Sequence, residues 1–230
     1  MKANVSLLLR AGGALALSAL LASCFPPRVP DSSVSLSFTL PAGETPTPDA
    51  GLRLAAIYTV RGSEGPQVKV LAQGYLSGDR GNVYLTRSQL EQVDQANCLP
   101  YYHSAPRTQE TVSVAGAKSC DISFVAYRAV GAGDGPTTAN VRYLSHDTYS
   151  YAAQAYSYSF KVAGNGLSAT ERGTRQAGWT LVRHLVINPS ATPSEFVVTR
   201  DSAPESSLNL PLRLHAPTDA FTSMSLKELP

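Results

Sequence analysis

The chain has 230 residues, of which 19 are Lys or Arg and 17 are Asp or Glu. A chain with nearly equal numbers of positive and negative side chains, and without basic clusters, lacks the electrostatic footprint of a nucleic-acid-binding protein. It is also poorly suited to charge-driven binding of anionic lipid. Its length is sufficient to bury a substantial core, as one large domain or as two small ones.

The first 23 residues have the pattern of an export signal. Lys2 and Arg10 provide a positive start without any acid, and every residue from 11 to 21 is apolar or small. At about 1.5 Å per residue, this run reaches only about half of the hydrocarbon core of a bilayer. The pattern therefore predicts a cleaved signal peptide over 1–23 rather than a spanning helix. Since two of the 19 basic residues leave with it, the remaining chain is neutral overall.

The segment ends in Leu21-Ala22-Ser23-Cys24. This sequence resembles the lipobox of bacterial lipoproteins, which consists of a Leu, two small residues and a Cys. The resemblance implies that the Cys24 thiol takes a diacylglycerol, that the preceding peptide is removed, and that the new amino group can be acylated. Two or three acyl chains, at about 0.8 kcal/mol per buried CH₂, hold a protein stably on a membrane. An ordinary signal peptide cut near Ala22, with a free Cys24 thiol, is the open alternative.

The same resemblance implies where the protein resides. The anchor would hold it on the cell membrane or the outer membrane, exposed outside the cytoplasm. Phe25 follows the Cys, in place of the Asp that retains lipoproteins on the inner membrane of some Gram-negative bacteria, so an outer membrane is allowed. Residues 24–33 are rich in proline, which favours an extended tether between the anchor and the domain.

Two cysteines remain after Cys24, namely Cys98 and Cys120. In an oxidising exported compartment we expect them to form a disulfide. Such a bond would close a loop of about 22 residues and contribute roughly 3 kcal/mol. A pair of buried free thiols is the alternative, and a metal site is disfavoured because the accompanying ligand spacing is missing.

Alternation of apolar and polar residues predicts short, half-buried strands in the first half of the chain. The pattern begins at 34–40, recurs at 52–60 and 68–72, and returns at 83–85 after a Gly-Asp-Arg-Gly turn. These strands predict a β-rich domain that starts directly after the tether.

One short helix is expected after the fourth strand. Thr86 and Gln89 fit a capping box, in which each side chain satisfies a free backbone amide at the start of a helix. Leu90 and Val93 would then face the core. The helix is predicted to end near Asn97.

The second half of the chain is also predicted to form strands. Apolar and polar residues alternate over 122–127 and 156–162, and Asn165-Gly166 favours a hairpin after the second run. The stretch 179–187 is apolar on both faces, as expected of a central strand.

Leucines alternate over 208–214, where Pro211 removes a backbone donor and therefore predicts an edge strand. Short strands without long intervening helices disfavour parallel βαβ units. The sequence predicts a mainly β domain over 34–230, an antiparallel β-sandwich or barrel-like domain with one short helix. A subdivision near 100–120 stays open.

Catalytic motifs are sparse. The chain lacks a Gly-x-Ser-x-Gly elbow, and the glycine-rich stretch 131–135 is interpreted as a turn. His146-Asp147 lies among tyrosines, where a carboxylate could raise the pKa of the imidazole or orient it, although an Asx-turn is the simpler interpretation. His184 lies in the apolar strand over 179–187 and is expected at the edge of the core. The four histidines share no motif: His103, His146, His184 and His215.

A tyrosine-rich stretch is the best candidate binding surface. Tyr149, Tyr151, Tyr156 and Tyr158 could form a platform on one sheet face, since tyrosine combines an apolar ring with a hydroxyl suited to sugars, peptides and protein surfaces. The alternative is that these residues pack the core, because tyrosine is a favoured strand residue.

The sequence predicts a lipid-anchored protein of the cell envelope that binds or scaffolds without catalysis. Its expected partners are the membrane, through the lipid, and envelope proteins or glycans. No nucleic acid, cofactor or metal is expected. The alternatives are an envelope hydrolase with a site near His103 or His146, and a carrier of an apolar ligand in a hollow barrel.

Overall fold

The computed structural model describes residues 33–41, 51–62, 65–93, 98–100, 107–131, 133–164, 166–188, 191–192 and 194–217. All of them belong to one compact unit, Ser33–Pro230. The expected signal peptide, the Cys24 anchor and His103 lie outside the described residues, as does Asn165 of the expected hairpin. Among the residues that are described, no helix combines the length and the apolar character needed to cross a bilayer.

Strands dominate the described part of the chain. The first seven are β1 (Val34–Thr39), β2 (Leu52–Gly62), β3 (Gly65–Ser77), β4 (Arg80–Leu85), β5 (Leu99–Pro100), β6 (Thr108–Val112) and β7 (Lys118–Arg128). The others are β8 (Val141–Ser145), β9 (Thr148–Ala152), β10 (Tyr156–Gly164), β11 (Leu167–Arg175), β12 (Gly178–Ile187), β13 (Glu195–Ser202) and β14 (Leu212–His215). Within the described residues, two short helical elements accompany them, α1 (Arg87–Glu91) and the 3-10 helix η2 (Glu205–Asn209).

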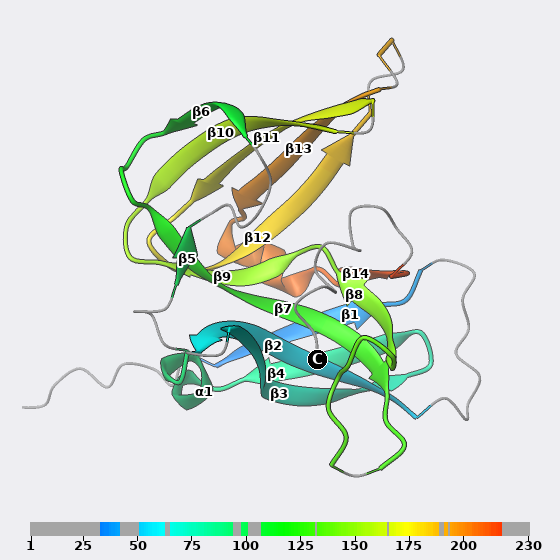
Figure 1. Cartoon of the computed structure of the whole chain (residues 1–230). Helices are drawn as coiled ribbons and strands as arrows, with labels where there is room; N and C mark the ends of the chain where they lie inside the picture. Colours follow the sequence, from blue (N-terminus) through cyan, green and yellow to red (C-terminus); the bar gives the residue numbers. More distant parts are fainter. Residues whose placement is uncertain are drawn as a thin grey trace, which may run out of the picture. The chain divides into compact units, whose positions relative to one another are not determined.

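The described strands form a barrel with further strands attached to it. The barrel follows the order β2-β3-β4-β1-β14-β8-β7, and β7 pairs back with β2 to close it. From β7 the sheet continues as β9-β12-β13-β11-β10-β6, which we call the outer strands (Figure 1). The prediction of a mainly β, barrel-like domain is confirmed. Most pairings are antiparallel, but β1 with β14 and β11 with β13 are parallel.

The barrel core follows from the period of two in each strand. On β1, Leu36 and Phe38 are buried while Ser35 is exposed. The ring of Phe38 lies 5.1 Å from that of Phe124 on β7, centroid to centroid. Burying side chains of this size contributes roughly 1.5–3 kcal/mol each, so strand pairing that turns the apolar side chains inward is strongly favoured.

Strand β7 joins the barrel to the outer strands. Its residue Ile122 pairs with Tyr58 of β2 on one edge and with Tyr149 of β9 on the other. Farther along, Val125 pairs with Leu144 of β8. Strands β8 and β9 therefore follow one another along the same edge of β7, and the chain leaves the barrel between them.

The edge strand predicted over 208–214 is wrong. The first part of this stretch lies in η2, and strand β14 begins only at Leu212. Pro211 precedes the strand, so its missing N–H removes no bond from the ladder. The short strand β14 lies between β1 and β8, within the closed ring.

The predicted helix start is confirmed, but the helix is shorter than expected. The backbone N–H of Gln89 donates to Thr86 Oγ1 at 3.3 Å, and the Thr86 N–H donates to Gln89 Oε1 at 2.8 Å. Gln89 Nε2 also donates to the carbonyl of Leu71 on β3, at 3.0 Å. Leu90 and Val93 are buried, which fixes α1 against the core.

Cys98 and Cys120 form the expected disulfide. It connects the residue before β5 to β7, next to the pairing of Leu99 with Ser119. The bond therefore attaches the start of β5 to β7, the strand that joins the barrel to the outer strands.

Replacing Cys98 and Cys120 together by Ala should lower the free energy of unfolding by about 3 kcal/mol, since the unfolded chain regains the entropy of a 22-residue loop. Urea unfolding with and without dithiothreitol measures this change. The reductant should destabilise the native protein and leave the variant unchanged. Equal urea midpoints for the two oxidised proteins would contradict the prediction.

Candidate functional site

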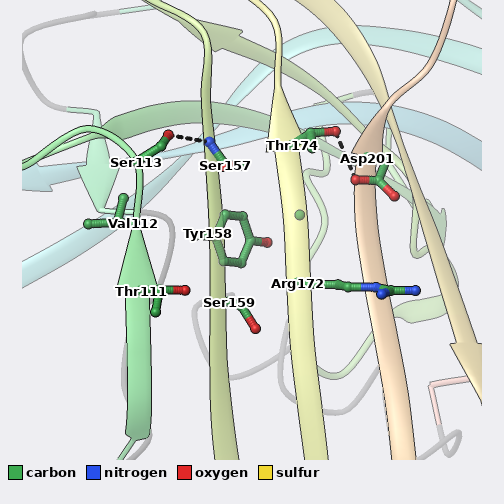
Figure 2. Close-up of a pocket in the computed structure, with 10 residues that line it drawn as sticks. Thr111, Val112, Ser113, Ser157, Tyr158, Ser159, Arg172, Thr174 and Asp201 are labelled. Atoms are coloured by element: carbon green, nitrogen blue, oxygen red, sulfur yellow. Dashed lines mark hydrogen bonds between the residues drawn. The ribbon is translucent and has the colours of Figure 1, made fainter.

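A surface hollow of about 620 Å³ lies over β6, β10, β11 and β13. Figure 2 shows the side chains that line it, most of which carry a hydroxyl group. The lining residues are Thr111, Val112, Ser113, Ser157, Tyr158, Ser159, Arg172, Gly173, Thr174 and Asp201.

Strand alternation places the hydroxyl groups on the outer side of these strands. On β10, Tyr156, Tyr158 and Phe160 are buried, whereas Ser157 is exposed and Ser159 is half-buried. The serines therefore occupy the phase opposite to the aromatic rings.

The register of the strands arranges these residues in two rows. Ser159 pairs with Thr111 of β6 and with Arg172 of β11, which gives the first row. In the second row, Ser157 pairs with Thr174, and Thr174 pairs with Asp201 of β13. Polar side chains thus face outward across four neighbouring strands.

Part of the lining already has partners within the protein. Ser113 Oγ accepts from the Ser157 N–H at 2.8 Å, and Thr174 Oγ1 donates to Asp201 Oδ1 at 2.8 Å (Figure 2). Arg172 makes no ion pair in the described part of the chain, and its side chain is exposed. Its planar guanidinium is suited to a carboxylate or phosphate oxygen.

A glycine lets an aromatic ring pack beneath the hollow. A Cβ at Gly173 would lie 2.6 Å from Cε1 of Tyr158 and 2.5 Å from the Arg200 carbonyl oxygen, so the ring occupies the space that a side chain would need. Tyr158 Oη donates to Glu171 Oε1 at 3.0 Å, and the guanidinium of Arg175 lies 5.8 Å from the ring centroid. These contacts pack the Tyr158 ring of β10 against Glu171, Gly173 and Arg175 of β11.

The four predicted tyrosines do not form an exposed platform. Tyr149, Tyr156 and Tyr158 are at most 7 % exposed, and only Tyr151 is half-buried. Burial is the main cause that raises the pKa of each of the three buried phenols. Tyr149 stacks on Trp179 with ring centroids 5.4 Å apart. These rings pack the interior because they occupy the inward phase of β9 and β10, which is the alternative that the sequence left open.

Two tyrosines outside that stretch are exposed instead. Tyr75 on β3 is 74 % exposed, and Tyr84 on β4 is 55 % exposed. The signal was present in the sequence, because Tyr84 lies between the apolar Val83 and Leu85 and so takes the polar phase of the strand.

Three histidines that share no sequence motif meet in the structure. The rings of His146 and His215 are stacked with centroids 4.0 Å apart and an angle of 6° between their planes. The His184 ring lies 5.1 Å from that of His146. His146 lies in the break between β8 and β9, His184 lies on β12, and His215 ends β14. Within the described residues, no group of His, Cys, Asp or Glu side chains is arranged to hold a metal ion.

Asp147 links strands at this position. Its Oδ2 accepts from Arg183 Nη1 at 2.6 Å, and its Oδ1 accepts from the backbone N–H of His184 at 2.8 Å. Its own N–H donates to Ser145 Oγ at 3.1 Å. Because both carboxylate oxygens bind groups of β12, Asp147 holds β12 against the β8–β9 break.

The environment of His184 disfavours a positive charge. Burial lowers the pKa of its imidazole to about 3, and Arg200, His146 and His215 add repulsion. Its Nε2 atom is buried without a hydrogen-bond partner among the described residues. The imidazole is therefore neutral at physiological pH and serves packing more readily than proton transfer.

Comparisons with known proteins give no family for this chain. No family model matches it, no curated protein matches it significantly, and no solved structure does.

The stability of the domain should fall as the pH is lowered from about 6.5 toward 3. An unfolded His184 takes up a proton below its ordinary pKa of 6.5, whereas the folded one stays neutral to about pH 3, so protons favour the unfolded state. This group alone contributes a slope of up to about 1.4 kcal/mol per pH unit.

Urea unfolding at pH 7, 6, 5 and 4 tests this expectation against a His184→Asn variant. The comparison isolates His184, because Asp147, Arg183, Arg200, His146 and His215 remain in both proteins. The free energy of unfolding of the variant should depend less on pH. Parallel pH profiles for the two proteins would rule out His184 as the cause.

Proposed function

We propose that the protein is a lipid-anchored lipoprotein of the bacterial cell envelope whose β domain binds an envelope ligand without catalysis. The hydroxyl-lined hollow carries this proposal, because it presents hydrogen-bonding groups from four paired strands. The lipobox resemblance at 21–24 supports the anchor, and the Cys98–Cys120 disulfide fits an oxidising compartment.

The lining of the hollow favours a glycan over a protein partner. Protein interfaces depend on buried aromatic or aliphatic anchors, and Val112 and Tyr158 are the large apolar side chains among the lining residues, most of which carry a hydroxyl group. Serine and threonine hydroxyls can donate to and accept from the hydroxyl groups of sugars. Arg172 adds a site for a carboxylate in the first row, whereas the Asp201 carboxylate in the second row accepts from Thr174, so the best-fitting ligand is an envelope glycan with an acidic group placed at Arg172.

The observed contacts weigh against the alternative functions. An envelope hydrolase near His146 would need a carboxylate to orient the imidazole, and the two Asp147 oxygens are occupied by Arg183 and His184. A carrier would need a hollow apolar barrel, whereas Phe38, Phe124 and neighbouring leucines are fully buried in its core.

Mass spectrometry of the protein purified from the membranes of its host should find Cys24 as the first residue, with a diacylglycerol thioether. A Cys24→Ser variant should stay uncleaved and lose the lipid mass, because the modified thiol is what directs processing. A mature chain that begins elsewhere and retains an unmodified Cys24 would refute the anchor.

Binding to isolated peptidoglycan tests the hollow, since its sugars supply hydroxyl groups and its peptides supply carboxylates. The chain from residue 24, made with Cys24→Ser, should sediment with the polymer. An Arg172→Ala, Ser159→Ala double variant should bind at least fivefold more weakly, because a charged donor and a hydroxyl are removed.

Lys161→Ala is the matched control, since Lys161 is exposed on the same strand but lies outside the hollow. It should bind as the native chain does. The melting temperature should be unchanged in both variants, since the altered side chains are exposed or half-buried. Equal peptidoglycan binding by the native chain and the double variant would refute the hollow as the ligand site.

A further inference from the structure

The hollow presents one side chain of each charge. Among the described residues that line it, Arg172 on β11 and Asp201 on β13 are the charged ones (Figure 2). Arg172 pairs with Thr199 of β13, and Asp201 pairs with Thr174 of β11, so the register places both on one face of the sheet. They are diagonal neighbours on adjacent strands, about 8 Å apart from Cα to Cα by the ordinary strand spacing and rise.

The two charges do not neutralise each other. The Arg172 side chain makes neither an ion pair nor a hydrogen bond within the described residues. Asp201 Oδ1 accepts from Thr174 Oγ1 at 2.8 Å, which orients the carboxylate, and Oδ2 makes no hydrogen bond in the same part of the chain. Since an exposed ion pair contributes little to stability, a ligand can engage both groups without a large loss to the protein.

The charged groups packed around these two residues are engaged elsewhere. Arg183 is opposite Asp201 on β12, but its Nη1 donates to Asp147 Oδ2 at 2.6 Å. On the other face of the sheet, Arg200 Nε lies 3.4 Å from Glu171 Oε1. Their charges are therefore compensated within the protein.

Two further charged residues, one of each sign, stand at the margin of the hollow. Lys161 is exposed two residues beyond Ser159 on β10, and it does not line the hollow. Glu110 on β6 lies outside the lining as well, with its Oε2 3.7 Å from Arg107 Nη2. The charge that a bound ligand meets is therefore set mainly by Arg172 and Asp201.

This arrangement discriminates between ligand charges. A purely anionic ligand that spans both residues is repelled by Asp201, and a purely cationic one is repelled by Arg172. A neutral sugar leaves both charges unmatched. A dipolar group, with an ammonium and a carboxylate on the same carbon atom, can place its carboxylate on the guanidinium and donate from its ammonium to Asp201 Oδ2.

The rest of the lining suits the chain to which such a group is attached. Ser157 and Ser159 offer hydroxyl groups, which can bind peptide amides or sugar hydroxyls. Val112 supplies a half-buried apolar surface, on which the methylene groups of an amino-acid side chain can pack.

We infer that the hollow takes the free amino-acid head of a peptide carried by an envelope glycan, with the carboxylate bound by Arg172 and the ammonium bound by Asp201. The inference rests on the proposed function for an acidic group at Arg172, and it adds the positive charge that the ligand carries beside that group. Peptidoglycan of the diaminopimelate type bears such heads on its stem peptides and is the probe used below.

Blocking the free amines of this peptidoglycan tests the inference. The chain from residue 24 with Cys24→Ser contains the whole compact unit Ser33–Pro230 and is the native sample. It should sediment with mock-treated polymer. Acetylation with acetic anhydride removes the positive charge and should weaken binding at least fivefold, because Asp201 then faces a neutral amide. An acidic glycan held by Arg172 alone would bind equally well or better after acetylation.

An Asp201→Asn variant assigns the effect to this residue. The amide oxygen keeps an acceptor for Thr174 while the negative charge is removed, so the melting temperature should stay the same. The variant should bind the untreated polymer at least fivefold more weakly, and acetylation should then change its binding little. Asp79→Asn is the matched control, since Asp79 is exposed in the turn between β3 and β4 and removes the same charge outside the hollow. It should bind, and respond to acetylation, as the native chain does.

The outcomes separate this inference from the proposed function. If acetylation leaves native binding unchanged, or if Asp201→Asn binds as the native chain does, the ammonium site is wrong. The acidic-glycan proposal then still stands, provided that the Arg172→Ala, Ser159→Ala variant loses binding. If acetylation weakens the Asp201→Asn variant as much as the native chain, the ammonium is bound elsewhere and the inference is overturned. A native chain that does not sediment with untreated polymer would overturn both.

Discussion

The pairing of β7 on both of its edges is the interaction on which the rest of the structure depends. One edge pairs with β2 and β5, and the other pairs with β8 and β9. A strand of 11 residues is long enough to serve two neighbours on each edge. Closure of the barrel uses the part near Ala126, and the outer strands start from the part near Cys120. Both parts are buried, so hydrophobic burial and backbone hydrogen bonds act together here.

The break between β8 and β9 decides where the outer strands go. Asp147 binds Arg183 and the backbone of His184, which ties the break to β12. The neutral His184 is packed at the same place. The Asp147 carboxylate therefore accepts from the His184 N–H just beyond the last β9–β12 pair, Thr148 with Val182.

The polar hollow and the exposed tyrosine of β4 arise from the same rule of alternation applied to different residues. On β10 the aromatic residues take the inward phase, so serines line the outer face and form a polar hollow over a packed interior. On β4 the apolar residues take the inward phase, so Tyr84 faces outward beside Asn82. In each case the packing of the buried side chains fixes the orientation of the strand, and the strand orientation in turn fixes the direction of the exposed side chains.

The sequence by itself determined the β class, the strand alternation, the capped start of α1 and the disulfide pairing, because each depends on neighbours in the chain or on a count of cysteines. Only the tertiary structure decided which strands close the barrel, that β14 lies inside the ring despite Pro211, and that His146, His184 and His215 meet. It also decided the sites: the tyrosines at 149–158 point inward, whereas Tyr75 and Tyr84 face outward. Alternation shows which residues share a face, but it does not show which face is buried until the strands have paired.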